Sequence, residues 1–75
     1  MEKKDLLVVF NIFGHHSQEQ IQIDSYKASL RGIFKQIENA PQYTFRVTVS
    51  ACLVSDKCVD ELKSEFKDNI HIFRY

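Results

Sequence analysis

The side chains in this sequence that are able to do chemistry cluster between positions 50 and 58, where Ser50, Cys52, Ser55, Asp56 and Cys58 lie. A serine or cysteine nucleophile needs a base within hydrogen-bond reach, and the sequence fixes no such partner. A metal site would need C-x-x-C or further ligands, and neither is present. We therefore interpret both cysteines as reduced structural thiols and predict no catalytic or metal-ligating residue in this chain.

The histidines and glycines give no stronger signal. His15 and His16 lie in a polar stretch with no acid or cysteine at ligand spacing, so we interpret them as solvated rather than as metal or phosphate ligands. His71 falls in an apolar stretch and is interpreted as an edge or packing residue. Gly14 and Gly32 are the only glycines, so the phosphate-binding pattern G-x-G-x-x-G is absent.

A strand followed by a helix positions this cluster. Residues 43–53 carry an apolar side chain at every second position, which predicts a strand with one apolar face. Val59, Leu62 and Phe66 then recur at helical spacing, behind Ser55 and Asp56, which we expect to cap the helix. Such a junction is where α/β proteins place ligands, because the helix N-terminus offers unpaired N–H groups.

Two further strands are predicted at the ends of the chain. Residues 6–13 are nearly all apolar, a pattern typical of a strand buried on both faces of a parallel sheet, and Gly14 ends this strand. Residues 68–69 make a turn, and residues 70–75 form a third strand.

A first helix is predicted between the first two strands. Residues 21–23 alternate isoleucine with glutamine and indicate a brief extended piece, so we start the helix at position 24 or 25. Pro41 stops it, since the residue before a proline avoids helical dihedrals. Gly32 within it predicts close packing on a neighbouring backbone. The helix carries an apolar stripe at Tyr26, Leu30, Ile33, Phe34 and Ile37.

This order predicts an α/β fold: a β-α-β-α-β Rossmann-like unit with three parallel strands in the order 1-2-3 and two helices on one face. The 75 residues make one small domain, residues 1–75. Nothing in the unit covers the second face of the sheet or the far edge of the first strand. Either the molecule self-associates, or these residues are the first part of a larger sheet.

Composition narrows the class of protein. The chain is 44% hydrophobic and 27% charged, as globular proteins are, and its ten basic and ten acidic residues cancel. That balance argues against a nucleic-acid partner or an acidic membrane surface. Residues 6–10 are too short an apolar run for a signal peptide or a membrane span, so we expect a cytoplasmic protein.

The succession LLVVFNIFG, YKASLRGIFKQ, FRVTVSACLVSDKCVDELKSEF and NIHIFRY resembles the N-terminal part of a GT-A glycosyltransferase of family 2. In that family a first strand precedes a helix of the type L-x-x-x-L-x-S-I-x-x-Q, and a second strand ends in V-D-D-x-S-x-D before a helix of the type T-V-E-I-L. Asp56 falls on the last acid of that segment, and residues 58–62 match the second helix.

The resemblance implies a nucleotide-sugar-binding portion of a larger GT-A domain. Phe13, Gly14, Ser50, Ala51 and Cys52 would form the nucleotide end of the pocket, with Phe13 against a planar ligand. The family's aspartate pair falls on Ala51 and Cys52, so base recognition would use backbone groups or Ser50. The complete enzyme would transfer a sugar from a nucleotide-diphosphate donor with Mn²⁺ or Mg²⁺ bound at a D-x-D motif that this chain lacks, so the 75 residues alone should be inactive.

A second hypothesis comes from another class of protein. The uncovered sheet face and edge also fit a small non-enzymatic α/β interaction module that acts as a homodimer. Burial of the first strand in a dimer, together with an absence of nucleotide binding, would favour this alternative.

Overall fold

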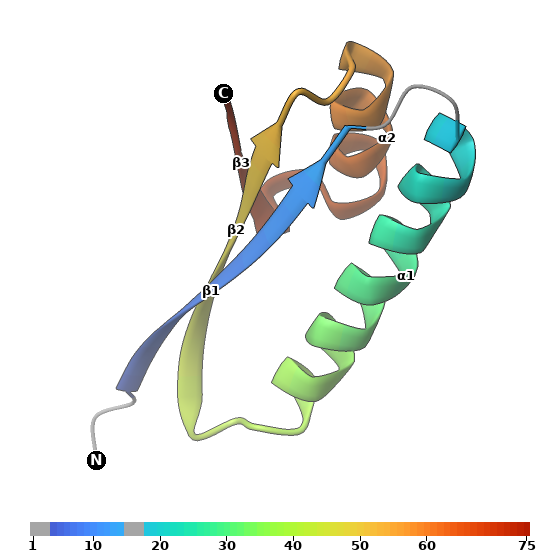
Figure 1. Ribbon diagram of the computed structural model, residues 1–75. Coiled ribbons are helices and arrows are strands. Elements are labelled where there is room, and N and C mark those ends of the chain that lie inside the picture. Colours follow the sequence, from blue (N-terminus) through green and yellow to red (C-terminus); the bar gives the residue numbers. More distant parts are fainter. Residues whose placement is uncertain (1–3, 15–17) are drawn as a thin grey trace.

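The computed structural model describes residues 4–14 and 18–75 of the chain (Figure 1). Strand β1 (Lys4–Phe13) leads to helix α1 (Glu19–Glu38), and strand β2 (Tyr43–Cys52) leads to helix α2 (Asp56–Phe66). A single 3₁₀ turn, η2 (Lys67–Asn69), then connects α2 to strand β3 (Ile70–Arg74). The element order is the predicted β-α-β-α-β.

The three strands form one parallel sheet in the order β1-β2-β3, as predicted. β1 pairs with β2 along its whole length, from Lys4 opposite Tyr43 to Phe13 opposite Cys52. β3 pairs only with the second half of β2, beginning with Ile70 opposite Val47. Because all strands run the same way, their carboxyl ends share one edge of the sheet, and both helices cover the same face (Figure 1).

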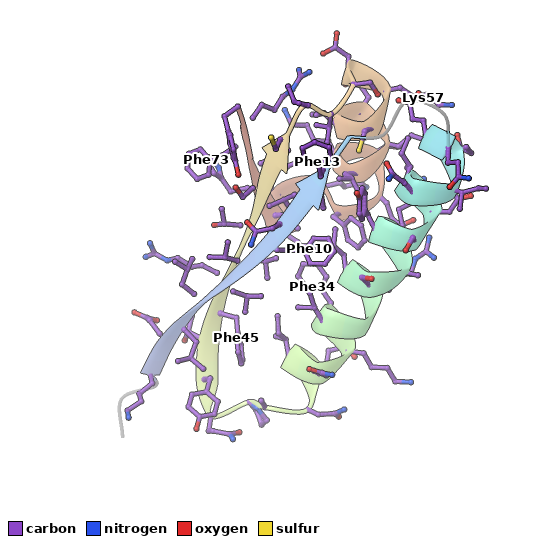
Figure 2. All side chains as sticks on the ribbon, in the orientation of Figure 1. Phe10, Phe13, Phe34, Phe45, Lys57 and Phe73 are labelled. Carbon is purple, nitrogen blue, oxygen red and sulfur yellow. The ribbon has the colours of Figure 1, made fainter. Side chains whose placement is uncertain are left out.

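The core lies between the sheet and the two helices. Its four largest fully buried side chains are Ile23 and Leu30 of α1, Leu62 of α2 and Val49 of β2. Phe10 and Phe34 point into the same layer, whereas Phe73 projects from the other side of the sheet (Figure 2). The complete set of buried hydrophobic residues is Ile12, Ile23, Leu30, Val47, Val49, Ala51, Val54, Cys58, Val59, Leu62, Phe66 and Ile70.

Helix α1 begins earlier than the sequence pattern predicted. It starts at Glu19, so the expected extended piece at residues 21–23 is wrong. Ile23 lies one turn before Tyr26 on the buried stripe and is 1% exposed, whereas Ile21 points outward and is 69% exposed. The alternation of isoleucine with glutamine therefore reflects one buried and one exposed position on a helix. Burial of Ile23 extends the helix by more than a turn.

The expected close packing at Gly32 is also wrong. A Cβ atom built on Gly32 would meet no heavy atom within 4 Å outside the adjacent backbone of α1. Gly32 lies on the exposed side of the helix, so no neighbouring backbone requires a glycine there.

Two ion pairs connect the helices along one line. Lys27 Nζ lies 2.9 Å from Glu61 Oε1, and one turn further Arg31 Nε donates to Glu65 Oε2 at 2.7 Å. Each donor and each acceptor recurs after four residues, so the pairs align the two helices in a single register. The hydrogen bond from Lys27 lowers the pKa of Glu61, and the hydrogen bonds from Arg31 lower the pKa of Glu65.

The sheet face opposite the helices is uncovered in the described structure, and we call it the open face. The strand β1 is thus covered on one face only, in contrast to the burial on both faces that its apolar sequence suggested: Leu7 is 65% exposed and Val9 is 52% exposed. By strand alternation and register, the open face consists of Asp5, Leu7, Val9, Asn11, Phe13, Thr44, Arg46, Thr48, Ser50, Cys52, His71, Phe73 and Tyr75.

Candidate functional site

The candidate site lies at the carboxyl edge of the sheet, where β1 and β2 end side by side. The N–H of Gly14 donates to the carbonyl oxygen of Cys52 at 2.9 Å, which extends the β1–β2 pairing by one residue. A Cβ atom on Gly14 would lie 1.9 Å from the carbonyl oxygen of Leu53. Only glycine fits this approach of two backbones, so Gly14 fixes the β1–α1 connection against the start of the β2–α2 connection.

Tyr26 of α1 anchors the last residue of β1. Its hydroxyl donates to the carbonyl oxygen of Phe13 at 2.7 Å and accepts from the N–H of Phe13 at 3.3 Å. One side chain therefore satisfies both backbone groups of Phe13 that point away from β2. The ring of Tyr26 also packs edge-on against Phe10, with centroids 6.1 Å apart. The aromatic ring of Phe13 stays 55% exposed beside this anchored backbone.

The predicted site residues of β2 divide between the two faces of the sheet. Ser50 and Cys52 lie on the open face, and Cys52 is directly opposite Phe13 in the register. The Ser50 hydroxyl lies 3.2 Å from the hydroxyl of Tyr75. Ala51 points into the core with no exposed surface, and its carbonyl oxygen already accepts from the N–H of Tyr75 at 2.9 Å. The structure thus brings Phe13, Ser50 and Cys52 together and directs the side chain of Ala51 away from them.

The start of α2 lies at the same edge, and Ser55 is its N-cap. The Ser55 hydroxyl accepts from the N–H of Cys58 at 3.2 Å and donates to the carboxylate of Glu19 at the start of α1. The expectation that Asp56 caps the helix is wrong, because Asp56 is the first helical residue. Its carboxylate instead accepts from the guanidinium of Arg74 at 2.6 Å.

Arg74 ties the end of β3 to the start of α2. Besides the ion pair with Asp56, its guanidinium donates to the carbonyl oxygen of Val54 at 3.0 Å. The two acceptors lie on either side of Ser55, so Arg74 holds the turn that presents the N-terminus of α2. No motif or residue spacing in the sequence predicts these contacts of Arg74, because Val54 and Asp56 lie far from it in the chain.

A small cavity of about 20 Å³ lies between the two strand–helix connections. Such a volume accommodates about one water molecule, which excludes a nucleotide. A ligand at this edge would therefore lie against the open face, over the ring of Phe13, rather than between the connections. The cavity is lined by Gly14, Glu19, Gln22, Ile23, Tyr26, Leu53, Val54, Ser55 and Cys58.

Both cysteines are free thiols, as predicted. Cys58 is buried in the core, and burial, reinforced by the charges of Glu19 and Glu61, raises the pKa of its thiol. A protonated, inaccessible thiol is a poor nucleophile, so Cys58 acts as a packing residue. Cys52 is partly exposed on the open face.

The histidines were the remaining candidate residues. The interpretation of His15 and His16 as solvated lies outside the described residues. His71 is on β3, where its ring packs edge-on against Phe73 with centroids 4.5 Å apart, which fits its interpretation as a packing residue. Within residues 4–14 and 18–75, no three metal-ligating side chains come close enough to hold an ion.

Comparison of the chain with protein-family models, with curated proteins and with solved structures finds no match. Neither described helix, α1 nor α2, is long and apolar enough to span a membrane. The sheet topology and the element order define the class of the protein: it is an α/β unit with a three-stranded parallel sheet and one open face.

Sequence reasoning missed the residue that anchors the edge. The spacing of apolar residues in α1 predicts Tyr26 only as part of the buried stripe, whereas in the structure its hydroxyl also holds the backbone of Phe13. A tyrosine among aliphatic residues at the start of a buried stripe is a usable signal, since a buried phenol needs a hydrogen-bond partner. Gly14 ends the first strand, as predicted, and its close approach to Leu53 is the additional feature that the sequence does not reveal.

Proposed function

We propose that this chain is the nucleotide-sugar-binding portion of a glycosyltransferase and binds the nucleotide at the carboxyl edge of its sheet. The observation that carries the proposal is the exposed ring of Phe13 at the shared ends of β1 and β2, on a backbone that Tyr26 holds in place. Ligands of open α/β sheets bind beyond the carboxyl ends of adjacent strands. The resemblance of the sequence to the N-terminal part of GT-A enzymes supports the choice of ligand.

In this proposal the base stacks on Phe13, and Ser50 with the backbone near Cys52 supplies hydrogen bonds to it. The open-face position of both β2 residues, level with or next to Phe13 in the register, supports this arrangement. Ala51 contributes no side-chain contact because its side chain is buried. The 75 residues bind without transferring the sugar.

The metal of the complete enzyme does not fit the described residues. A divalent ion on a sugar diphosphate needs several oxygen ligands, and these residues bring no three suitable side chains together. In this proposal, residues other than those that the structure describes would hold Mn²⁺ or Mg²⁺. The proposed location is the cytoplasm, where reducing conditions keep Cys52 and Cys58 as free thiols.

A two-dimensional NMR titration of the labelled chain with UDP and GDP, each with and without Mg²⁺, tests the proposal. We expect localised shifts at Phe13, Gly14, Ser50 and Cys52. Base stacking contributes about 1–3 kcal/mol, so Phe13→Leu should weaken binding by roughly 5–150-fold.

Phe73→Leu is the matched control for this titration. Phe73 has the same 55% exposure on the same open face, but it lies on β3, two strands away from Phe13 and opposite Ser50 in the register. Because it does not stack on the base in this proposal, we expect Phe73→Leu to weaken binding much less than Phe13→Leu does. Absence of shifts with either nucleotide at millimolar concentration, or equal weakening by both substitutions, would refute the proposal.

A further inference from the structure

The open face carries a large apolar patch for a protein of this length. Its five large apolar side chains, Leu7, Val9, Phe13, Phe73 and Tyr75, are each more than half exposed. Given 150–250 Å² for an aromatic side chain, their exposed parts amount to roughly 500 Å². Apolar patches of this size mark interaction surfaces.

The molecule is elongated. Its radius of gyration is 13.2 Å, against roughly 11 Å for a compact domain of this length, and its extents are 48 × 21 × 17 Å. A partner on the open face would supply the second layer that the sheet lacks.

We propose that the open face binds a second copy of this chain, sheet against sheet. The apolar side chains of the face alone present roughly 500 Å² per copy, which is more than half of the about 800 Å² that each partner of a standard stable interface contributes. Stacked sheets pack about 10 Å apart, a spacing that the side chains of this face can fill from both copies. The observations that support this dimer do not depend on whether the chain binds a nucleotide.

The arrangement of residue types on the open face is self-complementary. β1 and β3 carry the apolar side chains, and β2 between them carries Thr48 and Ser50. A two-fold axis across the strands places each column over the same column of the second copy. In the register that places Thr48 over Ser50, Leu7 lies over Phe13 of the second copy, Val9 over Asn11 and His71 over Phe73. The hydroxyls meet hydroxyls, which both donate and accept hydrogen bonds and can therefore pair with their own kind.

Arg46 determines the direction in which the copies stack. It lies opposite Leu7, at the amino end of the open face. With the strands of the two copies antiparallel, Thr48 lies over Ser50 of the second copy, and Arg46 lies over Cys52 of the second copy. The two guanidinium groups are then about six residues, or roughly 20 Å, apart. Parallel stacking would place Arg46 against Arg46, so we infer the antiparallel arrangement.

Sedimentation velocity of the full chain from about 1 µM to about 500 µM tests the proposal. We expect the mass to rise from 8.8 kDa towards twice that value with concentration. Val9→Asp at the centre of the face buries two carboxylates per dimer, each over a neutral Asn11 of the second copy that does not compensate its charge, and should raise the dissociation constant at least about 100-fold. Leu7→Lys is a second such variant, at a site exposed enough to leave the fold intact.

Ile21→Asp is the control, because Ile21 is equally apolar and exposed but lies on α1, away from the open face. It should leave the dissociation constant unchanged. Arg46→Ala tests the orientation: loss of like-charge contact would strengthen a parallel dimer, whereas an antiparallel dimer should not become tighter. A monomer at all concentrations, or equal dissociation by Ile21→Asp and Val9→Asp, would overturn the proposal. Capture of the open face by another protein, with the chain itself monomeric, would also overturn it.

Discussion

Replacement of Gly14 by alanine should destabilise the fold strongly, because the new methyl group has no space. Its Cβ would lie 1.9 Å from the carbonyl oxygen of Leu53 and 2.7 Å from its carbonyl carbon, where ordinary contacts are longer than 3.4 Å. Relief of the overlap requires the two backbones to separate by more than an ångström. That separation also breaks the 2.9 Å hydrogen bond from the Gly14 N–H to Cys52.

These two losses set the size of the effect. Overpacking against a rigid neighbour costs about 1–3 kcal/mol, and the lost hydrogen bond costs about 1 kcal/mol more. The total of about 2–4 kcal/mol is a large part of the roughly 4–11 kcal/mol expected for a chain of this length. Gly14→Ala should therefore lower the melting temperature by about 10–25 °C.

Gly32→Ala is the matched control, since the same methyl group is added where the structure has open space. Alanine is favoured over glycine within a helix by about 1 kcal/mol, so this variant should be more stable than the wild type. Urea unfolding followed by circular dichroism at the helix band measures both changes. A Gly14→Ala protein as stable as the wild type, or a Gly32→Ala protein less stable, would refute the reasoning from backbone contact.

Two further predictions concern the anchor at Phe13 and the ion pairs between the helices. Tyr26→Phe keeps the packing but removes both hydrogen bonds to Phe13, so we expect a loss of about 1–2 kcal/mol in urea unfolding and faster amide exchange at Phe13. Acid should weaken the fold, because the lowered pKa values of Glu61 and Glu65 mean that the unfolded chain takes up protons first. The stabilisation by these two carboxylates is complete above about pH 4.3, the pKa of a glutamate in the unfolded chain, and is lost as the pH falls through their lower pKa values in the folded state. The urea concentration at the midpoint of unfolding should therefore decrease over this acidic range. A Glu61→Gln, Glu65→Gln double variant should show a smaller decrease over the same range.

The order and direction of the elements could be predicted from the sequence because each strand and helix has its own periodicity. The alternation in residues 43–53 and the stripe from Val59 to Phe66 correspond to β2 and α2 almost to the residue. The start of α1 could not be placed, since a three-residue alternation fits an exposed and a buried helical position as well as a strand. Burial of Ile23 against the rest of the core decides between them, and a local pattern does not contain that information.

The candidate site was predictable only as an edge of the sheet. Parallel strands bring their carboxyl ends together, so the neighbourhood of Phe13 and Cys52 follows from topology. The contacts that shape the edge do not follow, because each joins residues distant in sequence: Tyr26 with Phe13, Gly14 with Leu53, and Arg74 with Asp56. The geometry of these three contacts depends on how α1 and α2 pack on the sheet, and sequence patterns do not predict that packing.

The two proposals place different partners on the same ring. In the proposed nucleotide site, Phe13 stacks on a base. In the proposed dimer, Phe13 packs against Leu7 of the second copy. One exposed ring face cannot do both at once. If the wild-type chain does both, nucleotide binding must therefore weaken self-association, and dimerisation must weaken nucleotide binding by the same factor. Val9→Asp separates the two, because it breaks the dimer and keeps Phe13. Nucleotide affinity that rises in this variant would show that the open face serves both ligands in turn, whereas unchanged affinity would place the nucleotide away from the dimer interface.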